Sequence, residues 1–305
     1  MDRARKRIGM DEVKEFRWCY SPVTIAVLDS GIGKHPDLEG KCILFKDFVN
    51  HRDIPYDDCG HGTHVCGILC GSGELSGGLY RGIIPRARLV VGKVLDEKGN
   101  GQADTMLEAL EWILKNCRRY DIRLLNISVG IGNLKDRKKE NQLRQMLDKL
   151  WEAGVVVVCA AGNKGPAVNS ISAVSASNKV ITVGCFDDFC EENKENNCAL
   201  YSGRGRVDNV YRKPDIVAPG TEIVSCNAFL RRKGEQYENT YIVQSGTSMS
   251  TPMITGCAAL LLQREPYLNN EKVKDRLKYT AEDLKQPWNL QGWGMVCVKR
   301  LLEIS

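Results

Sequence analysis

Two kinds of hydrophobic pattern alternate along the chain. Short apolar runs rich in β-branched residues predict strands, and we expect them at 23–28, 89–95, 124–128, 155–159 and 180–183. Longer segments in which apolar residues recur every three or four positions predict amphipathic helices, and we expect these at 102–117 and 137–153. Near-continuous apolar strands separated by helices predict an α/β fold of three layers, with a mostly parallel central sheet and helices on both faces.

The pattern runs without a Pro/Gly/Ser-rich linker or an internal repeat, so we expect one domain from residue 23 to residue 305. A short basic extension, residues 1–22, precedes it and is expected to be a solvated tail. Two polar insertions, the basic 135–144 and the acidic 187–195, are also expected to be solvated surface.

Composition excludes several classes of protein. The chain has 305 residues, 43% of them hydrophobic, which excludes general disorder. A net charge of +5, without a basic stripe, disfavours a nucleic-acid partner. The longest apolar run, 155–161, is too short to span a membrane, so no membrane partner is expected. These patterns leave the oligomeric state unknown.

The expected location is the cytoplasm. The basic N-terminus has no apolar segment behind it, unlike a signal peptide. The 13 cysteines show neither C-x-x-C pairs nor zinc-finger spacing. A reducing compartment tolerates that many unpaired thiols, whereas a secreted protein would risk wrong disulfides.

Three segments carry residues that packing alone does not explain. Asp29 closes an apolar strand, His61 stands between two glycines, and Ser248 lies among small hydroxyl residues that open an apolar helix, with Pro252 expected in its first turn. Each has a structural alternative. Asp29 could be a helix cap or a metal ligand, His61 a structural histidine (the role expected of His64), and Ser248 an N-cap. Together, Asp, His and Ser in glycine-rich turns fit nucleophilic acyl transfer.

The motifs DSGI at Asp29, GHGTHV at His61, AAGNKGP at Asn163 and SGTSMSTP at Ser248 resemble those of the subtilisin-like serine proteases. The resemblance runs from about residue 23 to residue 302. It implies a serine endopeptidase acting on peptides or unfolded proteins and needing no cofactor for catalysis. Asp29 would orient the imidazole, His61 would be the general base, Ser248 the nucleophile and Asn163 a donor to the oxyanion.

The resemblance also implies how a substrate binds, as an extended strand between two backbone segments. These segments are implied to be Gly99, Asn100 and Gly101, and Ser128, Val129 and Gly130. One wall of the pocket for the residue before the cut is implied to be Ala160, Ala161 and Gly162. Lys164 follows this wall, so we predict disfavour of Arg and Lys next to the cut. Ala103 and Met106 are implied to line a more distal apolar pocket.

The sequence departs from the secreted members of the family in two places. Only about 22 residues precede the first strand, which is similar to the intracellular subtilisins that lack a long prodomain. This extension would either block the cleft or pack as a plain helix. The segment 71–85 lacks the oxygen donors of a calcium loop, and Asp37 alone matches a family ligand. We therefore expect no strong metal site; a weak structural calcium, for instance among 187–195, stays open.

Two other functions compete with the endopeptidase. A pseudoprotease would grip peptides, or regulate a partner, without turnover, but such proteins usually lose a triad member and all three are present. A small-molecule α/β enzyme is disfavoured because no G-x-G-x-x-G follows the first strand.

Overall fold

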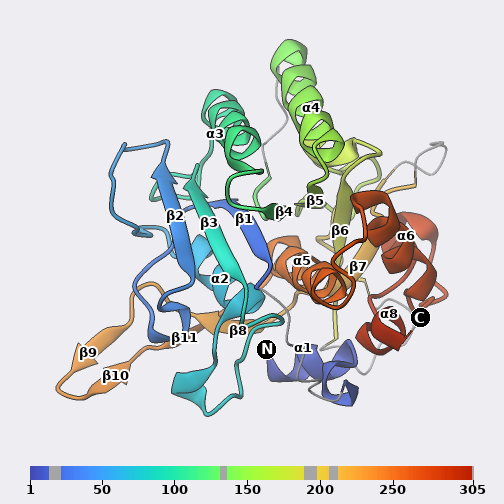
Figure 1. Cartoon of the computed structure of the whole chain (residues 1–305). Helices are drawn as coiled ribbons and strands as arrows, with labels where there is room; N and C mark the ends of the chain where they lie inside the picture. The colour runs from blue at the N-terminus through green and yellow to red at the C-terminus, as the bar shows by residue number, and fades with distance from the viewer. Residues whose placement is uncertain (14–21, 131–135, 189–197, 206–211, 304–305) are drawn as a thin grey trace.

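The computed structural model describes residues 1–13, 22–130, 136–188, 198–205 and 212–303 (Figure 1). Its centre is a seven-stranded sheet with the strand order β2-β3-β1-β4-β5-β6-β7. Every neighbouring pair in this sheet is parallel. The strands are β1 (Thr24–Asp29), β2 (Cys42–Asp47), β3 (Arg88–Lys93), β4 (Ile122–Ile127), β5 (Val156–Ala160), β6 (Ile181–Phe186) and β7 (Ile216–Pro219).

Helices cover both faces of the sheet. In Figure 1, α3 and α4 lie on one face, and α2 and α5 lie on the other. The helices are α1 (Asp2–Arg7), α2 (His61–Cys70), α3 (Ala103–Asn116), α4 (Arg137–Glu152), α5 (Thr247–Arg264), α6 (Asn270–Thr280), α7 (Trp288–Gln291) and α8 (Val298–Glu303). Short 3-10 turns lie at Met10–Glu12, Pro36–Leu38, Glu74–Ser76 and Ala173–Ala176. The predicted three-layer α/β fold is therefore confirmed.

Four further strands lie outside the central sheet. β8 (Ile223–Cys226) pairs antiparallel with β11 (Tyr241–Gln244), and between them in the chain β9 (Arg231–Lys233) and β10 (Gln236–Glu238) form a hairpin. This hairpin projects at the edge of the molecule in Figure 1. Sequence analysis did not predict these strands, because segments of three or four residues are too short to show a hydrophobic period, and β9 and β10 are also fully exposed.

The predicted elements of the central sheet agree with the structure to within about three residues at their ends, except that β2 and β7 were missed. β2 lies at the edge of the sheet and is mostly half-exposed, so it lacks the continuous apolar run of its neighbours. β7 is only four residues long and ends in a proline.

Residues 1–12 are not a solvated tail, and that prediction is wrong; the alternative that the extension packs as a plain helix agrees with α1. Met1, Ala4 and Ile8 are buried in the main hydrophobic core. The basic residues between them bind the body of the domain: Arg3 pairs with Asp188 at 2.8 Å and Arg7 with Glu282 at 3.2 Å. An amphipathic arrangement of apolar and basic positions therefore makes α1 part of the packed structure. The remainder of the extension, 14–21, lies outside the described residues.

Pro252 lies in the second turn of α5, not in the first, because the helix begins at Thr247. Helices tolerate proline poorly beyond the first turn, since the ring removes one backbone hydrogen bond. In the same turn, the hydroxyl of Thr251 donates a hydrogen bond to the carbonyl of Thr247 at 2.7 Å. Every residue of this helix except Ser248 and Arg264 is buried.

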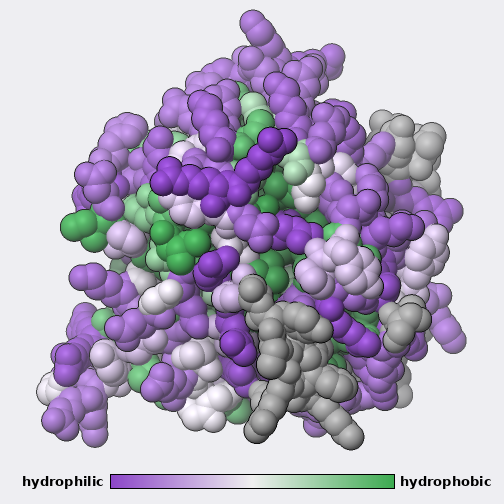
Figure 2. Space-filling model, viewed as in Figure 1, coloured by the Kyte–Doolittle hydropathy of each residue, from purple (hydrophilic) through white to green (hydrophobic). Residues whose placement is uncertain are grey.

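Hydrophobic residues on the face shown in Figure 2 form separate small patches within a mostly hydrophilic surface. Of the polar insertions, 136–144 forms the start of α4, whereas 135 and 189–195 lie outside the described residues. No helix in the described part of the chain combines the length and the apolar character needed to cross a bilayer.

Candidate active site

Asp29 and His61 are in direct contact. Asp29 is the last residue of β1 and is completely buried, and His61 is the first residue of α2. The Nδ1 atom of His61 lies 2.7 Å from Oδ1 of Asp29. The backbone N–H of Ser30 donates to the same oxygen at 2.7 Å. The carboxylate is thus fixed by its own strand end and directed at the imidazole.

The surroundings of His61 favour its protonated form. Burial lowers the pKa of His61, but the charge and the hydrogen bond of Asp29 together outweigh burial, so that the net pKa lies above 6.5. The side chain is still 25% exposed. A histidine with this partner can accept a proton and hold the resulting charge.

The start of α2 is held by Asp57, which sequence analysis missed. The Asp57 carboxylate is nearly buried and accepts hydrogen bonds from five groups. These are the N–H groups of Cys59, Gly60 and Thr63 and the hydroxyls of Ser30 and Thr63, at 2.6–3.2 Å. Asp57 thus satisfies free N–H groups at the helix start and places His61. An aspartate shortly before a helix start was the available sequence signal.

Lys93 is a second residue that sequence analysis missed. It ends β3 opposite Asp29 of β1, and its side chain is completely buried. The ammonium donates to the carbonyls of Ser30 and Leu95 at 2.8 and 2.7 Å and to Asp58 at 2.6 Å. It therefore ties together the chain that follows both strands. A lysine at the end of an otherwise apolar strand was the signal in the sequence.

Ser248 is the second residue of α5 and is half-buried. Asn163 lies at this helix start as well. Its Oδ1 atom accepts hydrogen bonds from the N–H and the hydroxyl of Thr247, both at 3.0 Å. Because two donors hold the amide oxygen, the orientation of the amide is fixed and its NH₂ group faces away from Thr247.

The space beside Gly246 is bordered by two donors. A methyl group in place of its hydrogen would lie 3.1 Å from Nδ2 of Asn163 and 3.7 Å from the backbone nitrogen of Ser248. Gly246 has a φ of +152°, a conformation that side chains rarely adopt. Glycine therefore keeps free a small space in which the Asn163 amide and the N–H of Ser248 can face an oxygen.

The two implied substrate edges differ in exposure. Gly99, Asn100 and Gly101 are exposed and form a turn closed by a hydrogen bond from the N–H of Asp96 to the carbonyl of Asn100. In the other segment the Ser128 side chain is buried and accepts from the Asn126 amide at 2.9 Å. Val129 is half-buried and Gly130 is exposed. Only the last two residues of that segment offer surface to a peptide.

The implied pocket wall continues β5. Ala160 and Ala161 are buried, whereas Gly162 is half-buried and donates its N–H to the hydroxyl of Thr247 at 3.2 Å. This bond joins the wall to the start of α5. Lys164, two residues further on, is exposed. An exposed ammonium is screened by solvent, which weakens any effect on a neighbouring subsite.

Ala103 and Met106, the implied wall of the more distal pocket, expose little surface. Both pack in the main hydrophobic core, with exposed fractions of 7% and 2%. They lie at the start of α3 on the face that points into the core, because the helix is amphipathic and these positions share its apolar stripe.

His64 has the contacts of a structural residue. It is completely buried, and burial lowers its pKa to about 3. Its Nε2 atom lies 3.0 Å from the carbonyl of Ile223 and 3.1 Å from that of Ile242. The neutral ring can therefore donate one proton to both carbonyls and join α2 to β8 and β11.

One buried group of potential metal ligands was found in the described part of the chain, formed by His35, Asp37 and Cys226. His35 and Asp37 already accept hydrogen bonds from protein donors. The His35 Nδ1 atom accepts from the N–H of Asp37 at 3.1 Å, so Nε2 carries the proton and donates to a carbonyl. The Asp37 carboxylate accepts from Tyr241, Ser72 and the N–H of Leu75. The donors surrounding Asp37 do not fit a calcium ion, which needs bare oxygens.

Comparison with known proteins agrees with this geometry. The chain matches the model of the Subtilase family over residues 21–294. It is 40% identical over 289 residues to serine protease AprX of Bacillus subtilis (strain 168), covering 90% of this chain but 64% of AprX. It is 31% identical over 295 residues to subtilisin DY of Bacillus licheniformis, covering 96% of this chain and 95% of that protein.

The likeness extends to three dimensions. The solved structure of sphericase superposes on this chain with a TM-score of 0.80 at 26% identity, and the match covers 97% of each chain. The structure of the S41 psychrophilic protease gives a TM-score of 0.74 at 29% identity, covering 91% of this chain and 92% of that one. Since the family model spans most of the sequence, the chain belongs to the subtilase family.

Proposed function

We propose that this chain is a serine endopeptidase that cleaves peptides or unfolded proteins through Asp29, His61 and Ser248. The observation that carries the proposal is the 2.7 Å contact between the buried Asp29 carboxylate and His61 at the start of α2. A buried carboxylate that holds an imidazole at the start of α2 is suited to activating a serine at the start of the neighbouring helix α5.

In this mechanism Ser248 attacks the carbonyl carbon of the scissile bond and transfers its proton to Nε2 of His61. Asp29 holds Nδ1–H and stabilises the imidazolium that forms. The oxyanion lies between the Asn163 amide and the N–H of Ser248. The carbon–nitrogen bond then breaks as His61 returns the proton to the leaving amine. Water, deprotonated by His61, hydrolyses the acyl-enzyme and regenerates the serine.

The test is labelling and turnover in two serine variants. Wild type should react with a fluorophosphonate probe and cleave a quenched peptide, whereas Ser248→Ala should do neither. Ser245→Ala is the matched control, because Ser245 is exposed and lies three residues before Ser248. If wild type binds peptides but is neither labelled nor active, the alternative of a pseudoprotease that regulates partners without turnover holds. Equal labelling of Ser248→Ala would exclude Ser248 as the nucleophile.

We propose that the substrate lies along Gly99–Gly101 and the exposed end of the segment that reaches Gly130. The support is that Gly99–Gly101 are exposed and that Cys59, two residues before His61, lies beside Gly99. For Lys164 we retain the prediction that it disfavours Arg and Lys before the cut. The test uses paired substrates that differ only in the residue before the cut, assayed on wild type and Lys164→Ser. If the preference between them is the same in both forms, Lys164 plays no part in specificity.

We propose that catalysis needs no cofactor and that a strong calcium site is absent near Asp37, with any weaker calcium site lying elsewhere. The support is the set of donors on Asp37, above all the Tyr241 hydroxyl at 2.6 Å. The melting temperature should change little between excess calcium and chelator. Tyr241→Phe removes one donor, so a new calcium dependence in that variant alone would support the argument. A large effect of chelator on wild type would contradict it.

We propose a cytoplasmic location as a working hypothesis. The support is that the cysteines described by the structure are free thiols, most of them buried. Burial raises the pKa of several, including Cys70 and Cys159 to about 12, so they pack as inert small hydrophobes. Fractionation of cells that express the chain at native level, with detection in culture medium and cell extract, tests this.

A further inference from the structure

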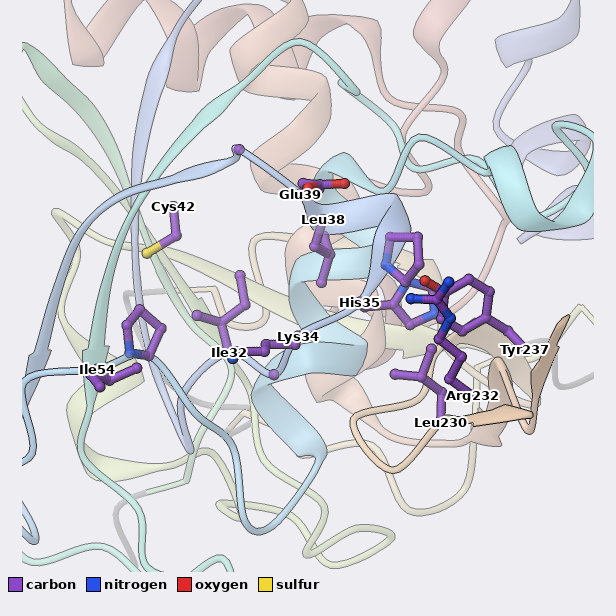
Figure 3. Close-up of a pocket in the computed structure, with 14 residues that line it drawn as sticks. Ile32, Lys34, His35, Leu38, Glu39, Cys42, Ile54, Leu230, Arg232 and Tyr237 are labelled. Carbon is purple, nitrogen blue, oxygen red and sulfur yellow. The ribbon is translucent and has the colours of Figure 1, made fainter. Parts of the chain in front are cut away.

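A cavity of about 510 Å³ lies beside the hairpin formed by β9 and β10. Three separate parts of the chain line it, as Figure 3 shows: the segment after β1, the segment around Ile54, and the hairpin. Most of the lining side chains are apolar, among them Ile32, Leu38, Ile54, Leu230 and Tyr237. A concave, largely apolar site of this size is suited to holding apolar side chains of a ligand.

Large apolar side chains remain open to solvent around this cavity. Ile54 is 71% exposed, Phe229 54% and Tyr237 38%. Their partial exposure contrasts with the near-complete burial of the main core. Exposed apolar groups that gather around a cavity indicate a binding surface, because covering them with another chain lowers the free energy.

Residues that border this cavity contact the start of α2, where His61 lies. The ring of Phe229 approaches Gly60, since a methyl group on Gly60 would lie 3.0 Å from its Cε2 atom. The other wall begins at Ile32, three residues after Asp29, and Gly33 beside it donates its N–H to the Thr63 hydroxyl at 2.8 Å. One wall therefore begins three residues after Asp29, and Phe229, which directly precedes the lining residue Leu230, lies against Gly60 beside His61.

The two neighbours that precede His61 face different ways. Cys59 faces Gly99, whose added methyl group would lie 3.5 Å from the thiol, and Gly60 faces Phe229. Gly99 belongs to the edge proposed for the part of the substrate before the cut. His61 thus lies between that edge and the groove. Because His61 gives its proton to the leaving amine, the chain that follows the scissile bond extends past His61 on the other side.

We propose that the groove between the segment 32–42, Ile54 and the β9–β10 hairpin binds the part of the substrate that follows the scissile bond, and that its pocket takes an apolar side chain from that part. The occupant is the substrate itself, so the inference rests on the proposed endopeptidase function. Leu230 and Ile54 reach the pocket from opposite walls and act as specificity-determining residues.

The experiment compares three fluorogenic substrates that are identical up to the cut. One carries a short aminocoumarin leaving group, one continues with four Gly and Ser residues, and one continues with four residues that include Leu and Phe. Mass spectrometry verifies the cut. Wild type should show a kcat/KM about 10-fold higher for the apolar extension than for the Gly/Ser extension, the size expected for filling a small apolar pocket.

Two pocket variants and one control outside the pocket test whether the preference for the apolar extension depends on the pocket. Leu230→Ser and Ile54→Ser should each reduce that ratio severalfold. Leu79→Ser is the matched control, because Leu79 is also exposed, at 50%, and lies outside the pocket; it should keep the ratio of wild type. A wild-type ratio near one, or a fall by the same factor for all three substrates in the pocket variants, would overturn the proposal.

Binding to Ser248→Ala keeps this inference separate from the proposed function. If no substrate is cleaved by wild type, the endopeptidase function fails. Fluorescence anisotropy still tests the groove, by measuring how tightly the two extended peptides bind to Ser248→Ala. The proposal is supported if the apolar peptide binds more tightly and if this difference is lost when Leu230→Ser is added to the same variant. Equal binding of both peptides refutes it.

Discussion

At the scale of single residues, the chemistry of His61 depends on two opposing effects on its pKa. Burial lowers the pKa and the Asp29 carboxylate raises it, with a net rise above 6.5. In the proposed mechanism His61 must be neutral to act as general base, so activity should be lost as pH falls through this raised pKa. The pKa rises because the Asp29 carboxylate lies 2.7 Å from Nδ1 of His61; in the proposed mechanism the other ring nitrogen takes the proton of Ser248.

Asp29→Asn tests this balance. The substitution removes the charge that raises the pKa of His61 and leaves the burial that lowers it, so the acid limb of the kcat/KM profile should move to lower pH. Turnover should also fall, by about 10⁴-fold, because an amide stabilises the wrong tautomer. The measurement is the pH profile of kcat/KM for both forms; an unmoved or raised midpoint would show that Asp29 does not control this titration.

Asn163→Ala tests the second residue-scale feature. In the proposed mechanism, deleting the amide would leave the oxyanion with the N–H of Ser248 alone, so kcat should fall by about 10²–10³-fold with little change in KM. Val168→Ala, at an exposed position nearby in the chain, provides a control that should retain activity. A rise in KM with unchanged kcat would instead make Asn163 a residue that binds the ground state.

At the scale of elements, the position of His61 depends on how α2 begins. Asp57 acts as a cap from outside the helix and also satisfies two hydroxyls that have no access to water. The carboxylate of Asp57 therefore stabilises the start of α2, through partners in the segment after β1 and in α2 itself.

Asp57→Ala should lower the free energy of unfolding by about 2–4 kcal/mol, the cost of a lost cap together with buried hydroxyls left without an acceptor. Denaturant unfolding of wild type and variant measures it. Asp53→Ala is the control, because Asp53 is exposed in the same segment and should change stability by less than about 0.5 kcal/mol. Similar losses in both variants would contradict a specific capping role.

At the scale of the whole molecule, residues 1–12 join distant parts of the chain. The carbonyl of Ile8 accepts from the N–H of Val298 at 2.8 Å, and Arg3 donates to the carbonyl of Thr221 at 2.6 Å. Ile8 is 1% exposed and belongs to the main core. The segment is therefore part of the cooperative unit, and it connects α8 with the chain between β7 and β8.

Ile8→Ala should accordingly cost about 2–5 kcal/mol of unfolding free energy, as expected for a buried aliphatic side chain replaced by a methyl group. Glu12→Ala removes an exposed ion pair with Lys299 in the same segment and should cost less than about 1 kcal/mol. Thermal unfolding of the two variants checks the difference. If Ile8→Ala were as mild as Glu12→Ala, the segment would unfold separately from the domain.

The amino-acid sequence by itself determined the features that depend on short, local patterns of residues. The hydrophobic periods of β1, β3, α3 and α4 were sufficient to predict them, because strands buried on both faces and long amphipathic helices leave a strong signal. The motifs around Asp29, His61, Asn163 and Ser248 were sufficient to predict the family. Each of these signals lies within a few consecutive residues.

Only the tertiary structure decided which partners those residues meet. The hydrogen bonds of Asp57 to Ser30 and of Lys93 to Ser30 join positions that are 27 and 63 residues apart. The burial of Ile8, the protein donors around Asp37 and the groove between Ile54 and Leu230 likewise depend on distant segments. Local sequence does not encode these contacts, because whether a charged or apolar side chain is solvated or packed depends on the free energy of the whole fold.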